Sequence, residues 1–174
     1  MKEQVILIDV NDFPLGEMEK LEAHQKGVLH RAFSVFIFNT KGELLLQQRA
    51  IEKYHSGGLW TNTCCSHPRP GEDNLDAANR RLMEEMGMKA SLNYGFNFIY
   101  RAEFESGLTE YELDHVFFGQ SDLLPVINQD EVENFRYINL ELLKEELVHH
   151  PDAYTPWLKI CLDKVIEHVA IEYK

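Results

Sequence analysis

Two adjacent cysteines, Cys64 and Cys65, occur in the segment TNTCCSHPRPGE (residues 61–72), and His67 follows two residues after the second. A thiol near an imidazole can belong to a disulfide, bind a metal, act as a reactive group or pack in the core. The chain has 3 cysteines, which cannot all pair within it, and sequence neighbours rarely bond each other. We therefore expect no structural disulfide, and the other three roles remain open.

Histidines and glutamates elsewhere supply the donor types of a transition-metal site. His24 and His30 are not spaced to share one face of a helix, so they would have to converge through a loop. Glu110 and Glu112 are spaced by two, which puts both carboxylates on one side of an extended strand. With His67 they would form a mixed nitrogen and oxygen site, suited to Zn²⁺ or Mn²⁺ more than to Ca²⁺. Each histidine taken alone is more often structural.

The segment EDNLDAANRRLMEEMG (residues 72–87) carries acids and arginines at the spacing of the Nudix box. That pattern is Gly, five residues, Glu, seven residues, then Arg-Glu-apolar-x-Glu-Glu-x-Gly-apolar. The matching positions are Glu72, Arg80, Leu82, Glu84, Glu85, Gly87 and Met88. Such a loop and helix hold Mg²⁺, a hard cation bound through one or two carboxylates and phosphate oxygens. Ser66 replaces the first glycine and Arg81 replaces the first glutamate, so we expect a phosphate and metal cradle with weakened hydrolytic function.

The same residues allow a simpler interpretation. Arg80–Glu84 and Arg81–Glu85 have the i,i+4 spacing of ordinary surface ion pairs, each worth about 0.3 kcal/mol. Either pair alone is explained that way, but seven matches at fixed spacing favour the box.

Runs of β-branched and aromatic residues predict strands along the chain. They cover residues 5–9, 33–39, 44–49, 96–104, 113–120 and 134–140. The second and third runs are separated by the turn segment TKGE, so we expect them to pair as a hairpin. Because helical patterns interrupt this series, the chain is expected to form one α/β unit.

Three helices are expected. The first lies between a polar cap at residues 73–74 and Gly87, which has the usual C-terminal position. The second covers residues 140–150, and the last opens with Thr155 and Pro156. The apolar face of the last helix consists of Leu158, Cys161, Leu162, Val165 and Val169. Since Cys161 lies on that face, we expect its thiol to be packed.

Composition and charge restrict the class of protein. The chain has 174 residues, 44% of them hydrophobic, and a formal net charge of −12, which suits one globular domain. The negative field repels nucleic acid and anionic membranes, so neither is an expected partner. No apolar run approaches the ~20 residues that span a bilayer, and the N-terminal segment is typical of a strand rather than a signal peptide. We therefore expect a cytoplasmic protein.

Seven ordered segments resemble type I isopentenyl diphosphate isomerase, a Nudix-fold enzyme family that interconverts isopentenyl and dimethylallyl diphosphate. They are GEMEKLEAH, LHRAFSVFIFN, WTNTCCSHPRPGE, RRLMEEMG, YRAEF, EYELDHVFFG and TPWLK, and they extend over nearly the whole chain. The resemblance implies a single-domain α/β Nudix fold over residues 1–174, with the box at residues 66–88. A mixed sheet would be sandwiched between helices, with a C-terminal helix over the active site.

The resemblance also implies roles for residues at matching positions. Cys65 would be a catalytic acid or base, and Glu112 would be the second catalytic group, on the opposite face of the substrate. Tyr100 would hydrogen-bond that glutamate, and Trp157 would face the cationic carbon of the substrate. Cys64 lies at a position that need not be cysteine in the family, so we expect it to pack in the core.

By the same resemblance, two metal ions and a diphosphate are implied. One Mn²⁺ or Zn²⁺ would be held by His24, His30, His67, Glu110 and Glu112. A Mg²⁺ ion would join Glu85 and the backbone carbonyl of Cys65 to the diphosphate. The basic residues that meet the diphosphate would be Lys20, Arg49, Lys53 and Arg81. The expected partner is thus a small-molecule diphosphate, and the oligomeric state stays open, with a monomer compatible.

The same residues are compatible with two other functions. A Nudix pyrophosphohydrolase acting on a nucleoside or prenyl diphosphate would share the helix and the fold, but it would leave Cys65, Glu112 and Trp157 without a task. A metal-stabilised binding module would use the histidines and glutamates structurally. We expect the isomerase.

Overall fold

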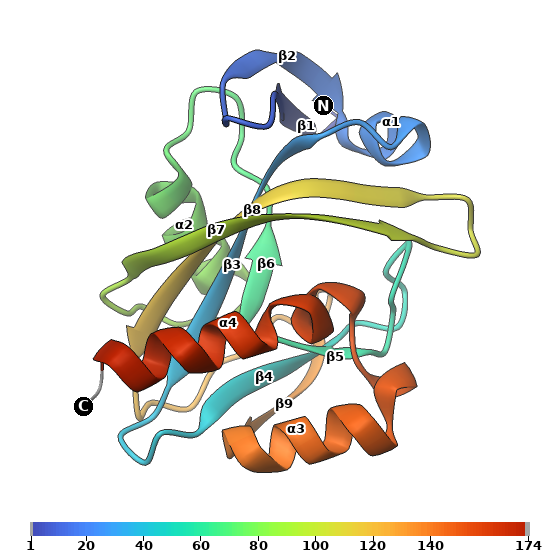
Figure 1. Cartoon of the computed structure of the whole chain (residues 1–174). Coiled ribbons are helices and arrows are strands. Elements are labelled where there is room, and N and C mark those ends of the chain that lie inside the picture. The colour runs from blue at the N-terminus through green and yellow to red at the C-terminus, as the bar shows by residue number, and fades with distance from the viewer. Residues whose placement is uncertain (1, 173–174) are drawn as a thin grey trace.

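The computed structural model describes residues 2–172, in which strands form one interconnected sheet and helices cover it (Figure 1). The helices are α1 (Lys20–Lys26), α2 (Asn74–Met86), α3 (Leu140–His149) and α4 (Pro156–Glu172), with a short 3₁₀ turn at Pro151–Ala153. The strands are β1 (Gln4–Ile8), β2 (Pro14–Glu19), β3 (His30–Phe38), β4 (Leu44–Arg49), β5 (Trp60–Thr61), β6 (Cys64–Ser66), β7 (Asn93–Glu103), β8 (Thr109–Gln120) and β9 (Val132–Ile138). Among the described residues, no helix is long and apolar enough to cross a membrane.

Strand β3 is the centre of the sheet. It pairs in parallel with β8 along its whole length, from His30 beside Glu112 to Phe38 beside Gln120. It also pairs antiparallel with β1, β4 and β6, while β8 continues to β7 and β4 continues to β5 and β9. A strand surrounded in this way is buried on both faces, which explains its nearly continuous apolar sequence.

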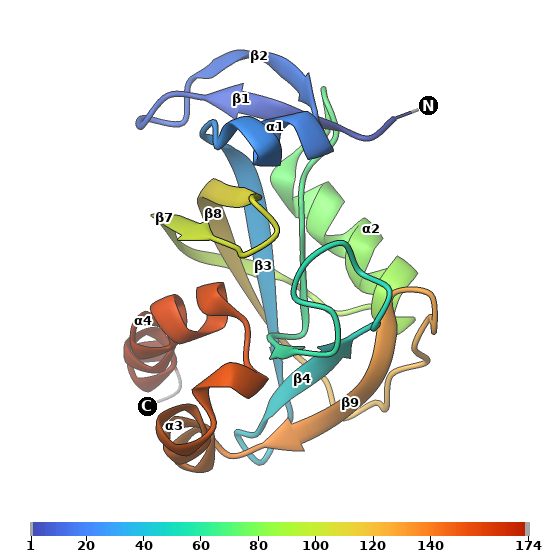
Figure 2. The same ribbon diagram turned by 90° about the vertical axis from the view of Figure 1, so that its right-hand side faces the viewer.

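Side chains of β3 alternate between two apolar cores. Phe36 and Phe38 pack with residues of α3 and α4, whereas Val35 and Ile37 pack with residues of α2. Figure 2 shows α2 on one side of the sheet and α3 and α4 on the other, with β1, β2 and α1 above. The predicted mixed sheet between helices is therefore confirmed. The C-terminal helix α4 reaches the candidate site with its first turn, where Trp157 lies.

The predicted helices and strands are present, and the main departures concern pairing. The predicted β3–β4 hairpin is limited to its turn, where Phe38 pairs with Leu44. Beyond the turn, β4 pairs with β9, because β3 is already paired with β8 and β6. The sequence did not predict the short strands β5 and β6, nor strand β2 and helix α1. Strands β5 and β6 have only two and three residues, β2 is largely exposed, and α1 is too short to show helical periodicity.

Gly87 ends α2 in the left-handed conformation, with φ of 62°. Its lack of a side chain also lets the segment after β8 lie against the helix end, because a Cβ here would come within 2.4 Å of the Val126 carbonyl oxygen. The Val126 and Asn128 amides donate to the carbonyl oxygens of Met86 and Glu85, at 2.8 and 2.9 Å. Gly87 therefore holds the end of α2 that carries Glu85.

We predict that Gly87→Ala lowers the free energy of unfolding by about 2–5 kcal/mol. Left-handed strain contributes ~1–2 kcal/mol and the clash with Val126 about 1–3 kcal/mol. Gly42→Ala is the matched control, because Gly42 has a φ of 76° but nothing within 4 Å of its added Cβ. Urea denaturation of both variants measures the difference, and equal losses would contradict the role of the close approach.

Candidate active site

The register of three strands places Tyr100, Glu112 and His30 in one row across the sheet. Tyr100 on β7 pairs with Glu112 on β8, and Glu112 is the parallel neighbour of His30 on β3. Side chains of directly opposed residues lie on the same face of a sheet, so the row brings a phenol, a carboxylate and an imidazole together. All three are buried.

Three imidazoles surround one oxygen of Glu112. The Nε2 atoms of His67, His30 and His24 lie 2.9, 3.3 and 3.6 Å from Glu112 Oε1. Helix α1 supplies His24, the first residue of β3 is His30, and His67 follows β6. The two histidines that were expected to converge through a loop do so, because α1 ends at Lys26 and the chain turns back at Gly27 into β3.

The backbone fixes which nitrogens of two imidazoles are free. His24 Nδ1 lies 2.7 Å from the Lys20 carbonyl oxygen, and His30 Nδ1 lies 2.8 Å from that of Val28. Because a carbonyl oxygen only accepts, each Nδ1 carries a proton, and in its neutral form each ring presents an Nε2 lone pair to Glu112. His24 Nε2 is buried without a hydrogen-bond partner among the described residues.

This arrangement fits a divalent transition-metal ion. Lone pairs of His24 and His30 face the oxygen of a carboxylate, and the Nε2 atoms of His30 and His67 are 3.2 Å apart. Burial lowers the pKa of His67 to about 4, so its ring is neutral at neutral pH despite the nearby Glu112 charge. The ligand atoms of the three histidines and Glu112 all lie within 4.8 Å of one another, which suits nitrogen and oxygen ligation of one ion.

The two glutamates of β8 have different environments. Tyr100 carries one hydroxyl proton, and its oxygen lies 2.6 Å from Glu112 Oε2 and 3.0 Å from Glu110 Oε2. Burial and the charge of Glu112 raise the pKa of Glu110 well above its usual range. Burial also acts to raise the pKa of Glu112, but the three imidazole nitrogens gathered at its Oε1 outweigh burial and hold that pKa well below its usual range. Paired acids with separated pKa values are typical of acid–base sites.

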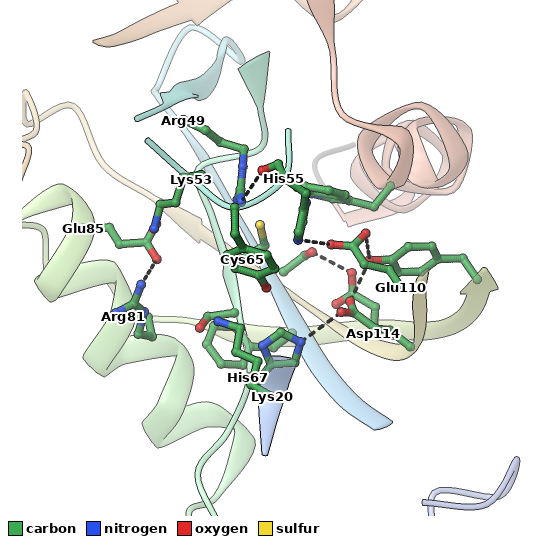
Figure 3. A pocket seen from close by; sticks show the side chains of 17 residues that line it. Lys20, Arg49, Lys53, His55, Cys65, His67, Arg81, Glu85, Glu110 and Asp114 are labelled. Carbon is green, nitrogen blue, oxygen red and sulfur yellow. Dashed lines mark hydrogen bonds and ion pairs between the residues drawn. The ribbon is translucent and has the colours of Figure 1, made fainter. Parts of the chain in front are cut away.

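A buried chamber adjoins this cluster (Figure 3). It is lined by Cys65, Glu85, Glu110, Glu112, Asp114, Tyr100 and Trp157, among others. Trp157 is held from α4 by a 3.2 Å hydrogen bond from its indole nitrogen to Asn62 Oδ1. Cys65 faces the chamber, and burial raises the pKa of its thiol, an effect that the charge of Arg49 opposes. Its neighbour Cys64 is fully buried in the α2 core, as expected for successive residues of a strand.

Four basic residues line the same chamber. They are Lys20, Arg49, Lys53 and Arg81. Three of them have carboxylate partners: Lys20 pairs with Glu3, Lys53 with Glu131, and Arg81 with Glu84, Glu85 and Glu131. The exception among the described residues is Arg49, whose guanidinium lies 5.3 Å from the Trp157 ring centroid and whose Nε is buried without a partner. An anion entering the chamber would therefore meet a convergent set of cations.

The box residues divide into a structural and a chamber-facing set. Arg80 binds both carboxylate oxygens of Glu72 at 2.6 and 2.8 Å, which ties the loop to α2, and also contacts Glu84. Glu85 is buried at the chamber wall, where Arg81 Nη2 lies 2.5 Å and Gln47 Nε2 lies 2.8 Å from its oxygens. The i,i+4 pairs expected of a surface helix exist, but the second of them is buried at the chamber rather than solvated.

Sequence reasoning missed two residues of this site. His55 is buried and its Nε2 lies 3.2 Å from Glu110 Oε1, but a single loop histidine gives no spacing signal. Asp114 continues the same face of β8 after Glu110 and Glu112, so the i,i+2 rule could have found it. Ser34 Oγ donates to Asp114 Oδ2 at 2.7 Å, and burial raises the pKa of this carboxyl.

We predict that a divalent transition-metal ion stabilises the protein through the imidazole cluster. At an ion concentration ~100 times Kd, the gain in unfolding free energy should be about 2.7 kcal/mol, and His30→Ala should abolish most of it. His149→Ala, which removes an exposed histidine of α3, should leave it intact. Denaturation with and without Mn²⁺ or Zn²⁺ measures the gain. An equal gain in His30→Ala would contradict the assignment of the cluster.

Comparison with known proteins identifies the family. A model described as NUDIX domain matches residues 28–158. Isopentenyl-diphosphate Delta-isomerase 2 of Aromatoleum aromaticum is 52% identical, over 95% of this chain and 88% of that protein. Isopentenyl-diphosphate Delta-isomerase of Pectobacterium atrosepticum is 50% identical, over 95% and 92%.

Solved structures share the fold at much lower identity. A Deinococcus radiodurans protein has a TM-score of 0.79 at 17% identity, covering 93% of this chain and 98% of its own. A MutT protein from Methanosarcina mazei has a TM-score of 0.64 at 17% identity, covering 78% and 91%. At these identities the likeness shows the fold alone. From the matches to the family model and to the half-identical relatives, we conclude that this chain belongs to the NUDIX domain family and, within it, to the type I isopentenyl-diphosphate Delta-isomerases.

Proposed function

We propose that this chain interconverts isopentenyl and dimethylallyl diphosphate by protonation and deprotonation of an allylic unit. One observation carries the proposal: Cys65 and Glu112, two groups that can exchange protons, line one buried chamber together with an indole ring and four cationic side chains. The names of the half-identical relatives support the same reaction.

The reaction explains the residue types. Moving the double bond from C3–C4 to C2–C3 requires a proton at C4 and loss of a proton from C2, with a tertiary carbocation between. An unactivated alkene accepts a proton reluctantly, so the acid must be held close and poised. Glu112 and Cys65 would act at the two ends of the allylic unit and exchange the roles of acid and base with the direction of reaction. Tyr100, donating to Glu112 Oε2, would orient that carboxyl.

The carbocation requires a dry and electron-rich environment, since water would trap it as an alcohol. Trp157 is buried, and its indole face could stabilise a neighbouring cation by ~2 kcal/mol when desolvated. Arg49 lies over this ring in the structure. A diphosphate that drew Arg49 toward itself would therefore also free the ring for the hydrocarbon end of the substrate.

Binding of the diphosphate would reorganise the chamber wall. The cavity measures about 50 Å³, room for a few waters but not for a five-carbon diphosphate. Lys20, Lys53 and Arg81 would exchange their carboxylate partners for phosphate oxygens. Arg49, which has no carboxylate partner among the described residues, would bind the diphosphate beside them. Glu85 and the Cys65 carbonyl would hold a Mg²⁺ ion that neutralises part of the diphosphate charge.

The imidazole cluster would hold one Mn²⁺ or Zn²⁺ through His24, His30, His67 and Glu112, with Glu110 beside them. Such an ion supplies positive charge that makes the carboxyl of Glu112 a stronger acid. The chain itself would supply the orientation: backbone carbonyls fix the rings of His24 and His30, and Tyr100 fixes the second oxygen of Glu112.

Proton NMR of isopentenyl diphosphate with the protein and Mg²⁺ in D₂O tests the proposal. Dimethylallyl diphosphate carrying deuterium at the new methyl group is the expected product. Release of a monophosphate without a shifted double bond would instead make the protein a pyrophosphohydrolase, and no change with bound metal would leave a binding module.

Replacing Cys65 by alanine should lower kcat at least ~100-fold, the smaller end of what a positioned acid or base contributes. Cys64→Ala is the matched control, because its side chain packs in the α2 core on the other face of the same strand. That variant should lose some stability and keep its activity. Similar kcat values for the two variants would contradict the catalytic role of Cys65.

A further inference from the structure

His55 is a buried side chain at the chamber that the proposed reaction does not use. It lies in the loop between β4 and β5, yet only 7% of it is exposed. The loop is closed by backbone hydrogen bonds from Arg49 N to Leu59 O and from Gly58 N to Arg49 O, at 2.9 and 3.0 Å. Gly57 packs closely against the backbone at the start of the loop, where an added Cβ would be 2.3 Å from the Ile51 carbonyl oxygen. A tightly folded loop therefore fixes the position of His55 at the chamber.

The ring is fixed on several sides. It stacks on Phe104 with centroids 4.7 Å apart and planes at 24°, and it meets the edge-on ring of Tyr54 at 4.4 Å. Its Nδ1 lies 3.3 Å from Ser56 Oγ, and its Nε2 lies 3.2 Å from Glu110 Oε1. Figure 3 shows His55 pointing at Glu110, with a dashed line joining the two side chains. The ring thus turns Nε2 toward the Glu110 carboxylate and Nδ1 toward the serine hydroxyl.

Glu110 has two contacts that together determine its orientation. Tyr100 lies at Oε2 and His55 at Oε1. Without the His55 contact, the carboxyl would be held at one oxygen only and could rotate about its last side-chain bond. Side chains that orient a metal-binding carboxylate without touching the ion can be as important as the ligands. Their removal commonly lowers metal affinity or activity 10–100-fold.

His24 connects this pair to the imidazole cluster. Ligand atoms of His24, His55 and Glu110 lie within 4.8 Å of one another, just as those of His24, His30, His67 and Glu112 do. His24 has one free nitrogen, because its Nδ1 donates to the Lys20 carbonyl oxygen. It therefore cannot ligate one ion in each group, and the four-ligand group is the more complete of the two.

We propose that His55 is a positioning residue of the metal centre, which holds the Glu110 carboxylate toward His24 through the 3.2 Å contact between Nε2 and Oε1. The consequence of this inference for catalysis rests on the proposed function. The consequence for metal binding is independent of that function. The loop that carries His55 also carries Arg49 at its start, and Arg49 Nη2 donates to the His55 carbonyl oxygen at 3.3 Å. Changing only the side chain of His55 leaves that contact in place.

Amide variants of different reach test the inference. A glutamine amide reaches the position of His Nε2, whereas an asparagine amide reaches only that of Nδ1. His55→Gln should keep most of the metal affinity, and His55→Asn should weaken it 10–100-fold. His55→Phe, which keeps the stack on Phe104 and removes both nitrogens, should behave like His55→Asn. The matched control is His168→Asn on α4, which removes another histidine stacked on a phenylalanine, Phe118, with centroids 4.3 Å apart.

The affinity for Mn²⁺ and Zn²⁺ is measured on chelator-stripped protein by competition with an indicator of known Kd, and the Tm of each metal-free variant verifies folding. Wild-type affinity in both His55→Asn and His55→Phe would overturn the inference, as would an equal loss in His55→Gln. In the isomerase assay, kcat of His55→Asn should fall more than KM for the diphosphate changes. If the wild-type protein isomerises nothing, the proposed function fails, while the metal affinities still decide the role of His55.

Discussion

A carboxylate buried among imidazole nitrogens is the constraint on which the rest of the site depends. Glu112 is 5% exposed, and the Nε2 atoms of three histidines face one of its oxygens. Burying a charge is costly unless it is paired, and His24 and His30 in their neutral form, each with its one proton donated to the backbone, cannot supply the pairing. A divalent cation would resolve both problems, since it would neutralise the carboxylate and occupy the lone pairs. The first turn of the chain after α1, the parallel pairing of β3 with β8, and the end of β6 all serve to bring these four groups together.

The chamber shows how one fold can be directed away from hydrolysis. Arg81 takes the place of a box glutamate and lies against Glu85, so a negative charge at the chamber wall is replaced by a positive one. The same chamber is lined by Cys65 and Trp157, which a phosphate-cleaving site would not require. The same rule of alternating strand faces separates Cys65, at the chamber, from Cys64, in the core. A chamber-facing cysteine and a core cysteine therefore occupy adjacent positions of one short strand.

Local patterns in the sequence predicted what depends on local structure. The cap at Asp73, the apolar spacing and Gly87 were enough to locate α2 and the carboxylates of the box. The common side of Glu110 and Glu112 also followed from strand geometry alone. Their relation to His30 did not, because it depends on the parallel register of β3 and β8, whose residues lie far apart in the chain. His55 was missed for a similar reason: its partner Glu110 is on a distant strand, and a loop histidine has no periodicity to reveal it.

Anomalous X-ray scattering from crystals grown with Mn²⁺ or Zn²⁺ tests most directly whether the buried carboxylate is neutralised by a metal ion. Our account predicts one strong peak bonded to the Nε2 atoms of His24, His30 and His67 and to Glu112, at ~2.0–2.2 Å. A structure in which these four side chains keep their mutual contacts with no peak between them, while ions occupy only surface carboxylates, would contradict it.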